Sequence, residues 1–438
     1  MRYAIHTEPT VGRVFLPLLM VFMMGLPIHA GEQTFVVERI GDGPIISQQT
    51  FLDAGAGDAE TGSPPFPTED DNINGPSVIR VPDWLKPRLA STAAADANYI
   101  LYFAHHRGDY MRAAWAEQIA GPWRLYNPLG DQSPHGLRGV MDLDGDENNG
   151  GANQINLENN LKIINEVASP DVFLDPANQR VVMYFHGQSR GIGQRTFVST
   201  SHDGLNFNSE ADGNQPGFGI APVQLGDFYF RGFEHKGRAY AFANKGFLLR
   251  APEGAGLTED TAWTPPQGFD FEQSLWERID GPIRRNHELD PNEQIDDPRH
   301  FGVLKDGDKL YTFFSRRNDR PERILVSVVD LSADDWTQWT ATHPPQDVLL
   351  PELDWEGGDL PLTNSANGPA TGVRQLRDPY IFTDADGQHY LFYTGRGEEA
   401  IGVARLTIVP EPGTLGAITG LIATVFGKRP RRTQGGEA

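Results

Sequence analysis

The sequence of 438 residues contains no cysteine. Disulfide-stapled scaffolds and thiolate metal sites are therefore excluded, and the fold must be stabilised by its core. His-Glu-x-x-His and Walker-type phosphate loops are also missing, which removes support for zinc hydrolysis and nucleotide chemistry. Sustained helical periodicity of the apolar residues is lacking as well, so a mainly helical fold is not expected.

Basic residues are few compared with acidic ones. Lys and Arg number 37 against 59 Asp and Glu, which gives a formal net charge of −22. A surface this acidic repels nucleic acid phosphates and anionic lipid headgroups. We therefore expect no nucleic acid partner, although solubility alone is a sufficient reason for such a charge.

The first 30 residues have the pattern of a secretory signal peptide. Arg13 precedes the apolar run 14–28, and small and polar residues follow it. This run is interrupted by Pro17 and Pro27 and is shorter than the ~20 residues that span a bilayer. Cleavage is expected after Ala30, and the alternative is a buried helix.

Residues 410–438 form a second segment that is expected to lie outside the fold. Pro410-Glu411-Pro412 is followed by the apolar stretch 415–426 and then by four basic residues. This order resembles the PEP-CTERM sorting signal of exported Gram-negative proteins. The resemblance implies exosortase-type processing, membrane contact through the tail alone, and a location at the cell surface or outside the cell. A coincidental amphipathic tail is the alternative.

The remaining body, 31–409, contains a repeated pattern. Each unit opens with an apolar, aromatic strand that usually follows Asp-Pro or Ser-Pro, and a Gly or Asn turn and further aromatic strands come next. Five segments begin such units: 75–79, 169–173, 227–230, 297–301 and 378–382. Short strands rich in aromatic and β-branched residues between Gly, Asp and Asn turns are typical of β-sheets.

Five units of this size predict an all-β fold, a five-bladed β-propeller that fills the whole body. A closed ring of sheets leaves no exposed sheet edge, which suits a chain without disulfides. A β-sandwich with accidental internal similarity is the alternative.

These motifs resemble the blades of the five-bladed glycoside hydrolases of families 43 and 32. Gly75-Pro76-Ser77, Ser169-Pro170-Asp171, Met183-Tyr184-Phe185-His186, Pro321-Glu322-Arg323 and Arg377-Asp378-Pro379 carry the resemblance, which extends over about 35–408. It implies an exported, carbohydrate-active protein that acts on an oligo- or polysaccharide. One fold hosts many functions, so the activity depends on the site residues.

Glycoside hydrolysis uses two carboxyl groups on either side of the scissile bond. The resemblance implies an aspartate base in blade one, an aspartate in blade two and a glutamate acid in blade three. Blade one has Asn74-Gly75 and blade two has Ser169 instead, so the mechanism does not transfer directly. Our candidates for catalysis are Asp227, Asp297 and Asp378 at repeat positions, with Asp171 and Glu234 as replacements.

Aspartates crowded together raise one another's pKa, and at least one is then expected to keep its proton and act as the acid. Each of them has an alternative role as a turn cap. Histidines and arginines beside these positions are candidates for sugar binding or for ion pairs between blades. They are His105, His106, His186, Arg231, Arg299, His300 and Arg377.

An acidic loop at 142–148 offers oxygen ligands for a structural calcium ion. It lacks the ligand spacing of an EF-hand, so a solvated surface loop is the favoured interpretation and no cofactor is required. Two functions remain open. One is a glycoside hydrolase, and the other is a non-catalytic carbohydrate-binding or surface-interaction propeller that has lost the blade-one base.

Overall fold

The computed structural model describes residues 34–53, 72–104, 106, 108, 110–126, 139–143, 154–157, 161–189, 191–208, 218–288, 298–366, 368 and 370–409. The part from Phe35 to Thr407 is one compact unit and is described by itself. The expected signal peptide, 1–30, and sorting tail, 410–438, lie outside the described residues.

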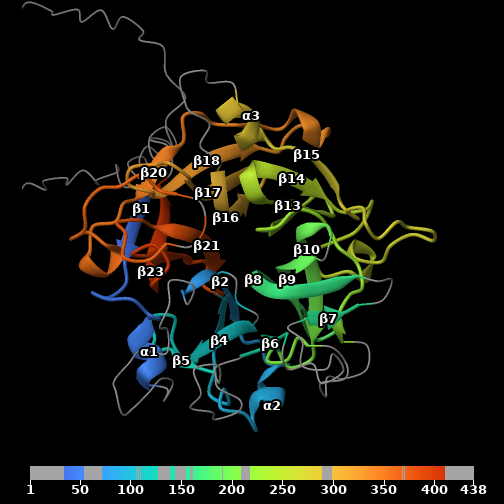
Figure 1. Cartoon of the computed structure of the whole chain (residues 1–438), viewed down its shortest axis with the longest axis horizontal. Helices are drawn as coiled ribbons and strands as arrows, with labels where there is room; N and C mark the ends of the chain where they lie inside the picture. Colours follow the sequence, from blue (N-terminus) through green and yellow to red (C-terminus); the bar gives the residue numbers. More distant parts are fainter. Residues whose placement is uncertain are drawn as a thin grey trace, which may run out of the picture. The chain divides into compact units, whose positions relative to one another are not determined.

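The described residues form five antiparallel sheets arranged in a ring, and the five-bladed β-propeller is confirmed (Figure 1). Each blade contributes its first strand to the centre of the ring. The strands that open the blades are β2 (Asn74–Arg80), β8 (Lys162–Asp175), β12 (Arg231–His235), β16 (Pro298–Asp306) and β21 (Arg377–Thr383).

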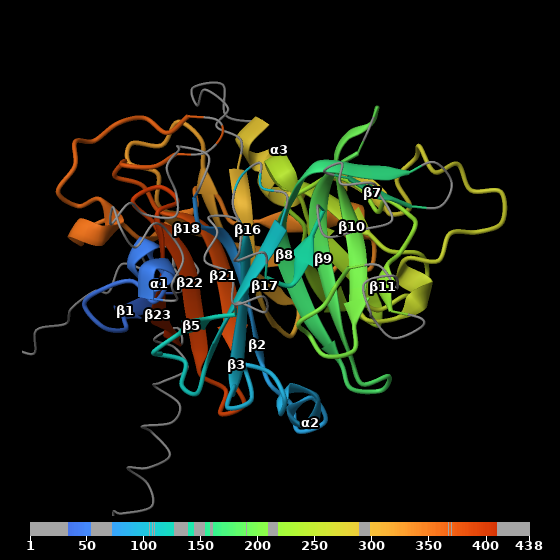
Figure 2. The ribbon, with the colours of Figure 1, turned by 60° about the horizontal axis from the view of Figure 1, so that its bottom comes forward.

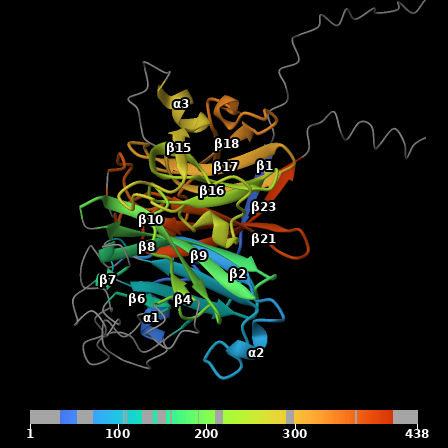
Figure 3. The same cartoon turned by 90° about the vertical axis from the view of Figure 1, so that its right-hand side faces the viewer.

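The first two blades are both five-stranded sheets that include short edge strands. The first continues with β3 (Tyr99–Ala104), β4 (Tyr110–Ala116), β5 (Arg124–Leu125) and β6 (Met141–Asp142). The second contains β7 (Gln154–Asn156), β9 (Arg180–Ser189), β10 (Gly193–Ser201) and β11 (Gly219–Ile220). Strands β2 and β4 contact β8, so the two blades pack directly against each other (Figure 3).

The third and fourth blades follow the same order. The third continues with β13 (Arg238–Phe242), β14 (Phe247–Arg250) and β15 (Glu277–Asp280). The fourth continues with β17 (Lys309–Arg316), β18 (Ile324–Asp330), β19 (Thr340–Ala341) and β20 (Gln346–Leu349). Aromatic side chains such as Phe233, Phe242 and Phe301 fill the space between these two sheets.

The fifth blade is closed by the N-terminal strand of the body. Its order is β1 (Thr34–Arg39), β23 (Ala400–Val409), β22 (His389–Gly395) and β21 (Figure 2). Arg39 holds this closure, because its guanidinium group donates two hydrogen bonds to the fully buried Glu356 carboxylate at 2.7 and 2.8 Å. The hydroxyl group of Tyr393 donates to the same carboxylate.

Helices are short and lie in the connections. They are α1 (Gln48–Asp53), α2 (Lys86–Leu89), α3 (Pro282–Glu288), η4 (Asn244–Gly246), η5 (Asp260–Ala262), η6 (Trp336–Gln338) and η7 (Asp354–Glu356). In the part of the chain that the structure describes, no helix has the length and apolar character to span a membrane.

Five residues, each in the inner strand of its blade or just before it, share an uncommon backbone conformation with positive φ. These are Gly75 (61°), Ser169 (51°), Tyr229 (59°), His300 (54°) and Asp378 (50°). A shift of strand register surrounds this position in four of the blades. Such bulges change the direction of a side chain, and backbone strain of this kind concentrates at functional sites. We call these five residues the axial ring.

Candidate active site

The sequence predicted that Asp227, Asp297 and Asp378 occupy equivalent positions in three blades, and the axial ring shows that they do not. Tyr229 occupies the ring position in blade three and His300 in blade four, which are two residues after Asp227 and three after Asp297. The backbone bulge sets the register of each unit, and an aspartate before the strand does not. Of the five ring residues, Asp378 alone is a carboxylic acid.

Aromatic rings gather around Tyr229. The ring of His300 lies edge-on to it with centroids 4.7 Å apart, and the ring of His186 does so at 5.1 Å. His106 approaches from blade one at 6.5 Å, and Phe228 lies beside it at 4.9 Å. The tyrosine is therefore the common neighbour of three histidines from blades one, two and four.

Asp378 and His300 are neighbours in the ring. Oδ1 of Asp378 lies 3.2 Å from Nδ1 of His300, and both side chains are buried. Burial raises the pKa of Asp378 to about 7, and the nearby Glu398 carboxylate adds to this effect. Burial, together with the Arg299 and Arg377 guanidinium groups, lowers the pKa of His300 well below its usual value. A neutral imidazole thus accompanies a carboxyl group that exchanges its proton near neutral pH.

A row of buried charges with alternating sign adjoins this pair. Nδ1 of His106 lies 2.5 Å from Oε2 of Glu398, and Nη1 of Arg377 donates to the other oxygen at 2.8 Å. Nε of Arg377 lies 3.0 Å from Glu322, which also accepts two hydrogen bonds from Arg299. Burial alone would raise the pKa of Glu398, but His106 and Arg377 lower it to about 2. Glu398 is therefore a permanent anion next to Asp378.

The sequence reasoning did not select Glu398 or Glu322 as site residues. Each lies two residues before the third strand of its blade, and each pairs with the arginine that precedes the ring residue, Arg377 or Arg299. This Arg and Glu pattern recurs in blades four and five. A search for repeated charge pairs, in addition to repeated aspartates, could have found both glutamates.

Tyr229 was also missed, because only the aspartate of its segment was considered. Its hydroxyl group lies 2.9 Å from Nε2 of His106. Burial raises the pKa of Tyr229, so the phenol keeps its proton. It therefore presents a hydroxyl group at the centre of the ring.

His186 occupies the blade-two side of this centre. The side chain is 1% exposed, and neither ring nitrogen has a hydrogen-bond partner among the described residues. Nε2 lies 3.6 Å from Oε1 of Glu166, which is too long for a direct hydrogen bond. Buried polar atoms of this kind normally have a partner, so the centre has unused capacity to bind a polar ligand.

Asp171 and Glu234 lie apart from this group. Asp171 is buried, and its Oδ2 accepts a hydrogen bond of 2.7 Å from the backbone N–H of Gly232, which links blades two and three. Burial raises the pKa of Asp171 to about 6. Glu234 is exposed and accepts a hydrogen bond from the backbone N–H of Leu257. Both carboxylates thus satisfy backbone groups.

The remaining predicted residues divide into three cases. Asp227 is partly exposed and forms an ion pair of 3.0 Å with Arg278. Arg231 donates to the carbonyl groups of Pro170 and Phe301 and so connects neighbouring blades. Asp297 and His105 lie outside the described residues.

Metal binding receives no geometric support in the described residues, where no three His, Asp or Glu side chains are arranged to hold an ion. Most of the acidic loop at 142–148 lies outside them. The described residue Asp142 uses its backbone N–H to donate to Asn208. The calcium hypothesis therefore stays untested.

A Gly-x-Ser-x-Gly sequence occurs at 187–191. In an α/β-hydrolase this motif stands on a turn between a strand and a helix, where the serine is exposed. Here Ser189 ends β9 in a hairpin to β10, and it is 1% exposed. The structural context for a nucleophilic serine is thus missing.

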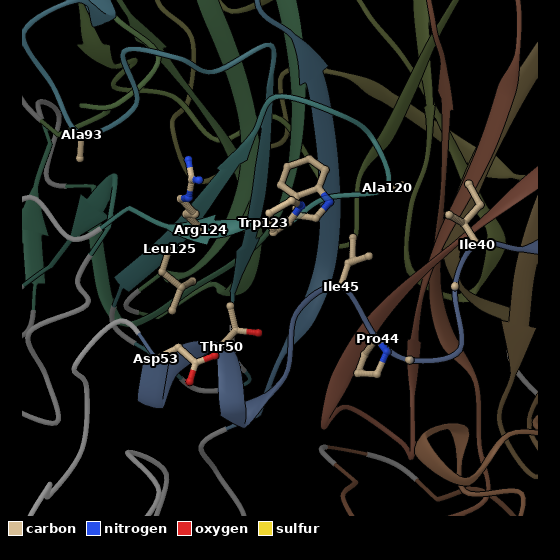
Figure 4. Close-up of a pocket in the computed structure, with 13 residues that line it drawn as sticks. Ile40, Pro44, Ile45, Thr50, Asp53, Ala93, Ala120, Trp123, Arg124 and Leu125 are labelled. Atoms are coloured by element: carbon tan, nitrogen blue, oxygen red, sulfur yellow. The ribbon is translucent and has the colours of Figure 1, made fainter.

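A separate cavity of about 650 Å³ lies between the segment after β1 and the outer strand β5 (Figure 4). Ile45, Trp123 and Leu125 provide apolar walls, and Thr50 and Asp53 of α1 provide polar groups. The indole N–H of Trp123 donates to the carbonyl group of Ile119. The residues of the axial ring do not line this cavity.

Solved structures that resemble the chain include glycoside hydrolases. An α-L-arabinofuranosidase from Lactobacillus brevis aligns with 76% of this chain and 90% of its own, at 12% identity and a TM-score of 0.42. A thermostable family-43 glycoside hydrolase aligns with 78% and 95%, at 13% identity and a TM-score of 0.43. A family-43 β-xylosidase/α-arabinofuranosidase from a compost microbial metagenome aligns with 85% and 96%, at 12% identity and a TM-score of 0.44.

No family model matches the sequence. The sequence is 33% identical over 340 residues to the uncharacterized protein R118 of Acanthamoeba polyphaga mimivirus. This alignment covers 77% of the chain and 84% of the relative, and it therefore includes most of the propeller. The chain belongs to the same protein family as the mimivirus protein R118.

Proposed function

We propose that the protein is a carbohydrate-active enzyme that hydrolyses a glycosidic bond at the axial ring. The observation that carries this proposal is the Asp378–His300 pair, a buried carboxyl group next to a neutral imidazole on the axis of the propeller. Its protonation changes near neutral pH, as acid–base catalysis requires. The resemblance of the blade motifs to family-43 and family-32 enzymes supports the same substrate class.

The surroundings of the pair suit a sugar. Tyr229 and His186 present a hydroxyl group and ring nitrogens, and sugar hydroxyl groups both donate and accept hydrogen bonds. The aromatic faces of Tyr229 and Phe228 offer apolar surface beside these polar groups. The fixed anions Glu398 and Glu322 are neutralised by Arg377 and Arg299. A neutral glycan is thus the ligand class that we favour.

A non-catalytic carbohydrate-binding propeller is the second candidate. It is favoured by Gly75 and Ser169, which leave blades one and two without a carboxylate in the axial ring. A binding protein needs the polar groups of the ring but no proton transfer. The two candidates therefore differ in whether Asp378 is required for turnover or only for affinity.

The test is a screen of the full chain against aryl glycosides and polysaccharides at several pH values. Asp378→Asn is expected to lower kcat by at least about 10²-fold, the usual contribution of an acid–base group. The matched control is Asp334→Asn, because Asp334 is exposed and forms its ion pair with Lys236 on the surface. Glycan binding without hydrolysis in the parent protein would favour the second candidate, and neither binding nor hydrolysis would refute both.

We also propose that the protein is exported, with cleavage near Ala30 and later processing or membrane retention near 410–412. The composition of the two terminal segments supports this proposal. Mass spectrometry of the native protein is expected to find an N-terminus close to residue 31. An intact Met1, or a cytosolic pool of the protein, would contradict it.

A further inference from the structure

A second proton-transfer group is needed if the axial ring hydrolyses a glycosidic bond. Hydrolysis requires one group that donates a proton to the leaving oxygen and another that accepts a proton from water. Asp378 and His300 are only 3.2 Å apart and form one unit. The carboxylates that would supply the other unit are missing at Gly75 and Ser169.

Three residues from different blades form a continuous line of hydrogen-bond contacts that ends at the centre. Oε2 of Glu398, before β23, lies 2.5 Å from Nδ1 of His106, which follows β3. Nε2 of the same imidazole lies 2.9 Å from Oη of Tyr229, before β12. Carboxylate, imidazole and hydroxyl are therefore connected in the order that serves proton transfer in other enzymes.

The contacts of His106 define which atoms carry protons. A carboxylate only accepts, so Nδ1 must be the donor to Glu398. Asn74 also faces this atom: its amide nitrogen lies 2.8 Å from Nδ1, and its Oδ1 has no partner among the described residues. With the amide turned over, Oδ1 faces the ring N–H and shares its one proton with Glu398.

The charge of His106 depends on the groups that face it. These are Glu398, Asp378, Arg377 and His300, with Tyr229 on the other nitrogen. Burial would lower the pKa of His106, but the Glu398 carboxylate outweighs this effect and raises it. As an imidazolium, His106 donates from Nε2 to Oη, and the phenolic proton of Tyr229 is then directed away from His106.

We propose that Tyr229 is the catalytic proton donor of the axial ring and that His106 and Glu398 are its positioning residues. This inference rests on the proposed glycoside hydrolysis. As the glycosidic C–O bond breaks, the Tyr229 proton moves to the leaving oxygen and the Nε2 proton of His106 moves to Oη. Water adds its oxygen to the anomeric carbon, and its proton goes to Asp378.

The high pKa of the phenol does not obstruct this step. Tyr229 receives one proton while it gives another, so the phenolate does not accumulate, and the net donor is the imidazolium. His106 is left neutral and Asp378 protonated, and one proton passed from Asp378 to His106 through water restores the site. The line of residues 398, 106 and 229 therefore provides what a carboxylic acid provides in other glycosidases.

The experiment has a readout that does not need activity. Ring ¹⁵N chemical shifts of His106, identified by their loss in His106→Gln, are followed against pH in the full-length parent and in Glu398→Gln. We expect a titration midpoint above pH 6.5 in the parent and about one pH unit lower in Glu398→Gln. If His106 titrates near pH 6.5 in the parent and Glu398→Gln does not change this midpoint, the proposed proton transfer through His106 and Tyr229 is refuted, whether or not hydrolysis is found.

Kinetics supply the second readout. Tyr229→Phe is expected to lower kcat about 10²- to 10³-fold with little change in KM. His106→Gln is expected to abolish the fall of kcat at high pH, because this fall reports the loss of the His106 proton. Tyr102→Phe is the matched control, because that variant also loses one buried tyrosine hydrogen bond, to the carbonyl group of Gly204, which does not belong to the axial ring. Full activity of Tyr229→Phe would refute the assignment, whereas an inactive parent with the expected His106 titration would refute hydrolysis alone.

Discussion

Oδ1 of Asp378 lies 3.2 Å from Nδ1 of His300, where the first strands of blades four and five meet. Both residues have positive φ, so the same backbone distortion directs the two side chains to the axis. Burial, together with the neighbouring Glu398 anion, raises the pKa of Asp378 to about 7. The bulge that opens each blade thus brings Asp378 and His300 together in the buried surroundings that change their pKa values.

Asp378 makes stability depend on pH in a defined window. Its pKa is 3.8 in its ordinary state and about 7 in the fold, so the folded protein binds more protons between these values. Its contribution to stability is complete below pH 3.8 and is lost as the pH rises to about 7. Urea unfolding of the parent should show this decline, and Asp378→Asn should lack it. Parallel curves for the two proteins would contradict the assignment.

Arg377 connects two buried glutamates, Glu322 and Glu398, through different nitrogens. Lysine has a single nitrogen and cannot reach both carboxylates in the same way. We expect Arg377→Lys to lower the free energy of unfolding by about 3–5 kcal/mol, as other broken buried ion pairs do. Arg396→Lys at a partly exposed pair should change it by about 1 kcal/mol or less. Equal effects of the two substitutions would argue against a buried network.

Gly75 of blade one lies against Ser169 of blade two. Its φ is 61°, and a Cβ there would lie 3.1 Å from Cα of Ser169. Gly237 has a similar φ of 71°, but nothing lies within 4 Å of its Cβ position. Both alanine variants should lose about 1–2 kcal/mol from the left-handed backbone. Thermal and urea unfolding should show a clearly larger loss of stability for Gly75→Ala. Similar losses would show that the contact with Ser169 does not destabilise the variant.

Closure of the ring depends on Glu356. It is fully buried and binds Arg39, and the same arginine also pairs with Glu352, which is 65% exposed. Glu356→Ala leaves the arginine and the Tyr393 hydroxyl without their acceptor, so a loss of about 3–5 kcal/mol is expected. Glu352→Ala should cost about 1 kcal/mol or less. If denaturant unfolding gives similar values, the closure does not depend on the buried contact.

The blade number was predictable because each blade repeats the same alternation of strand and turn. The units at 75–79, 169–173 and 378–382 contain ring residues at the expected place. The site was less accessible to sequence reasoning. Aspartates in front of the strands at 227 and 297 looked equivalent to Asp378, but the bulge places Tyr229 and His300 in the ring. Local sequence does not reveal the register of a bulge, because the packing of neighbouring blades determines it.

Glu398 shows a second limit of the sequence. It lies 292 residues from His106 along the chain, yet the two side chains are in contact. Only the closed ring brings blade five next to blade one. A contact of this kind depends on the number of blades and their order, so it becomes visible after the fold is known.

The central claim is that a glycan binds at the axial ring, and its most direct test is a crystal structure of the full-length Asp378→Asn variant with an oligosaccharide found in the substrate screen. We predict a sugar residue within hydrogen-bond distance of the Tyr229 hydroxyl and of the His300 ring. A sugar bound only elsewhere, for example in the cavity beside Trp123, with the ring side chains unchanged, would contradict the account.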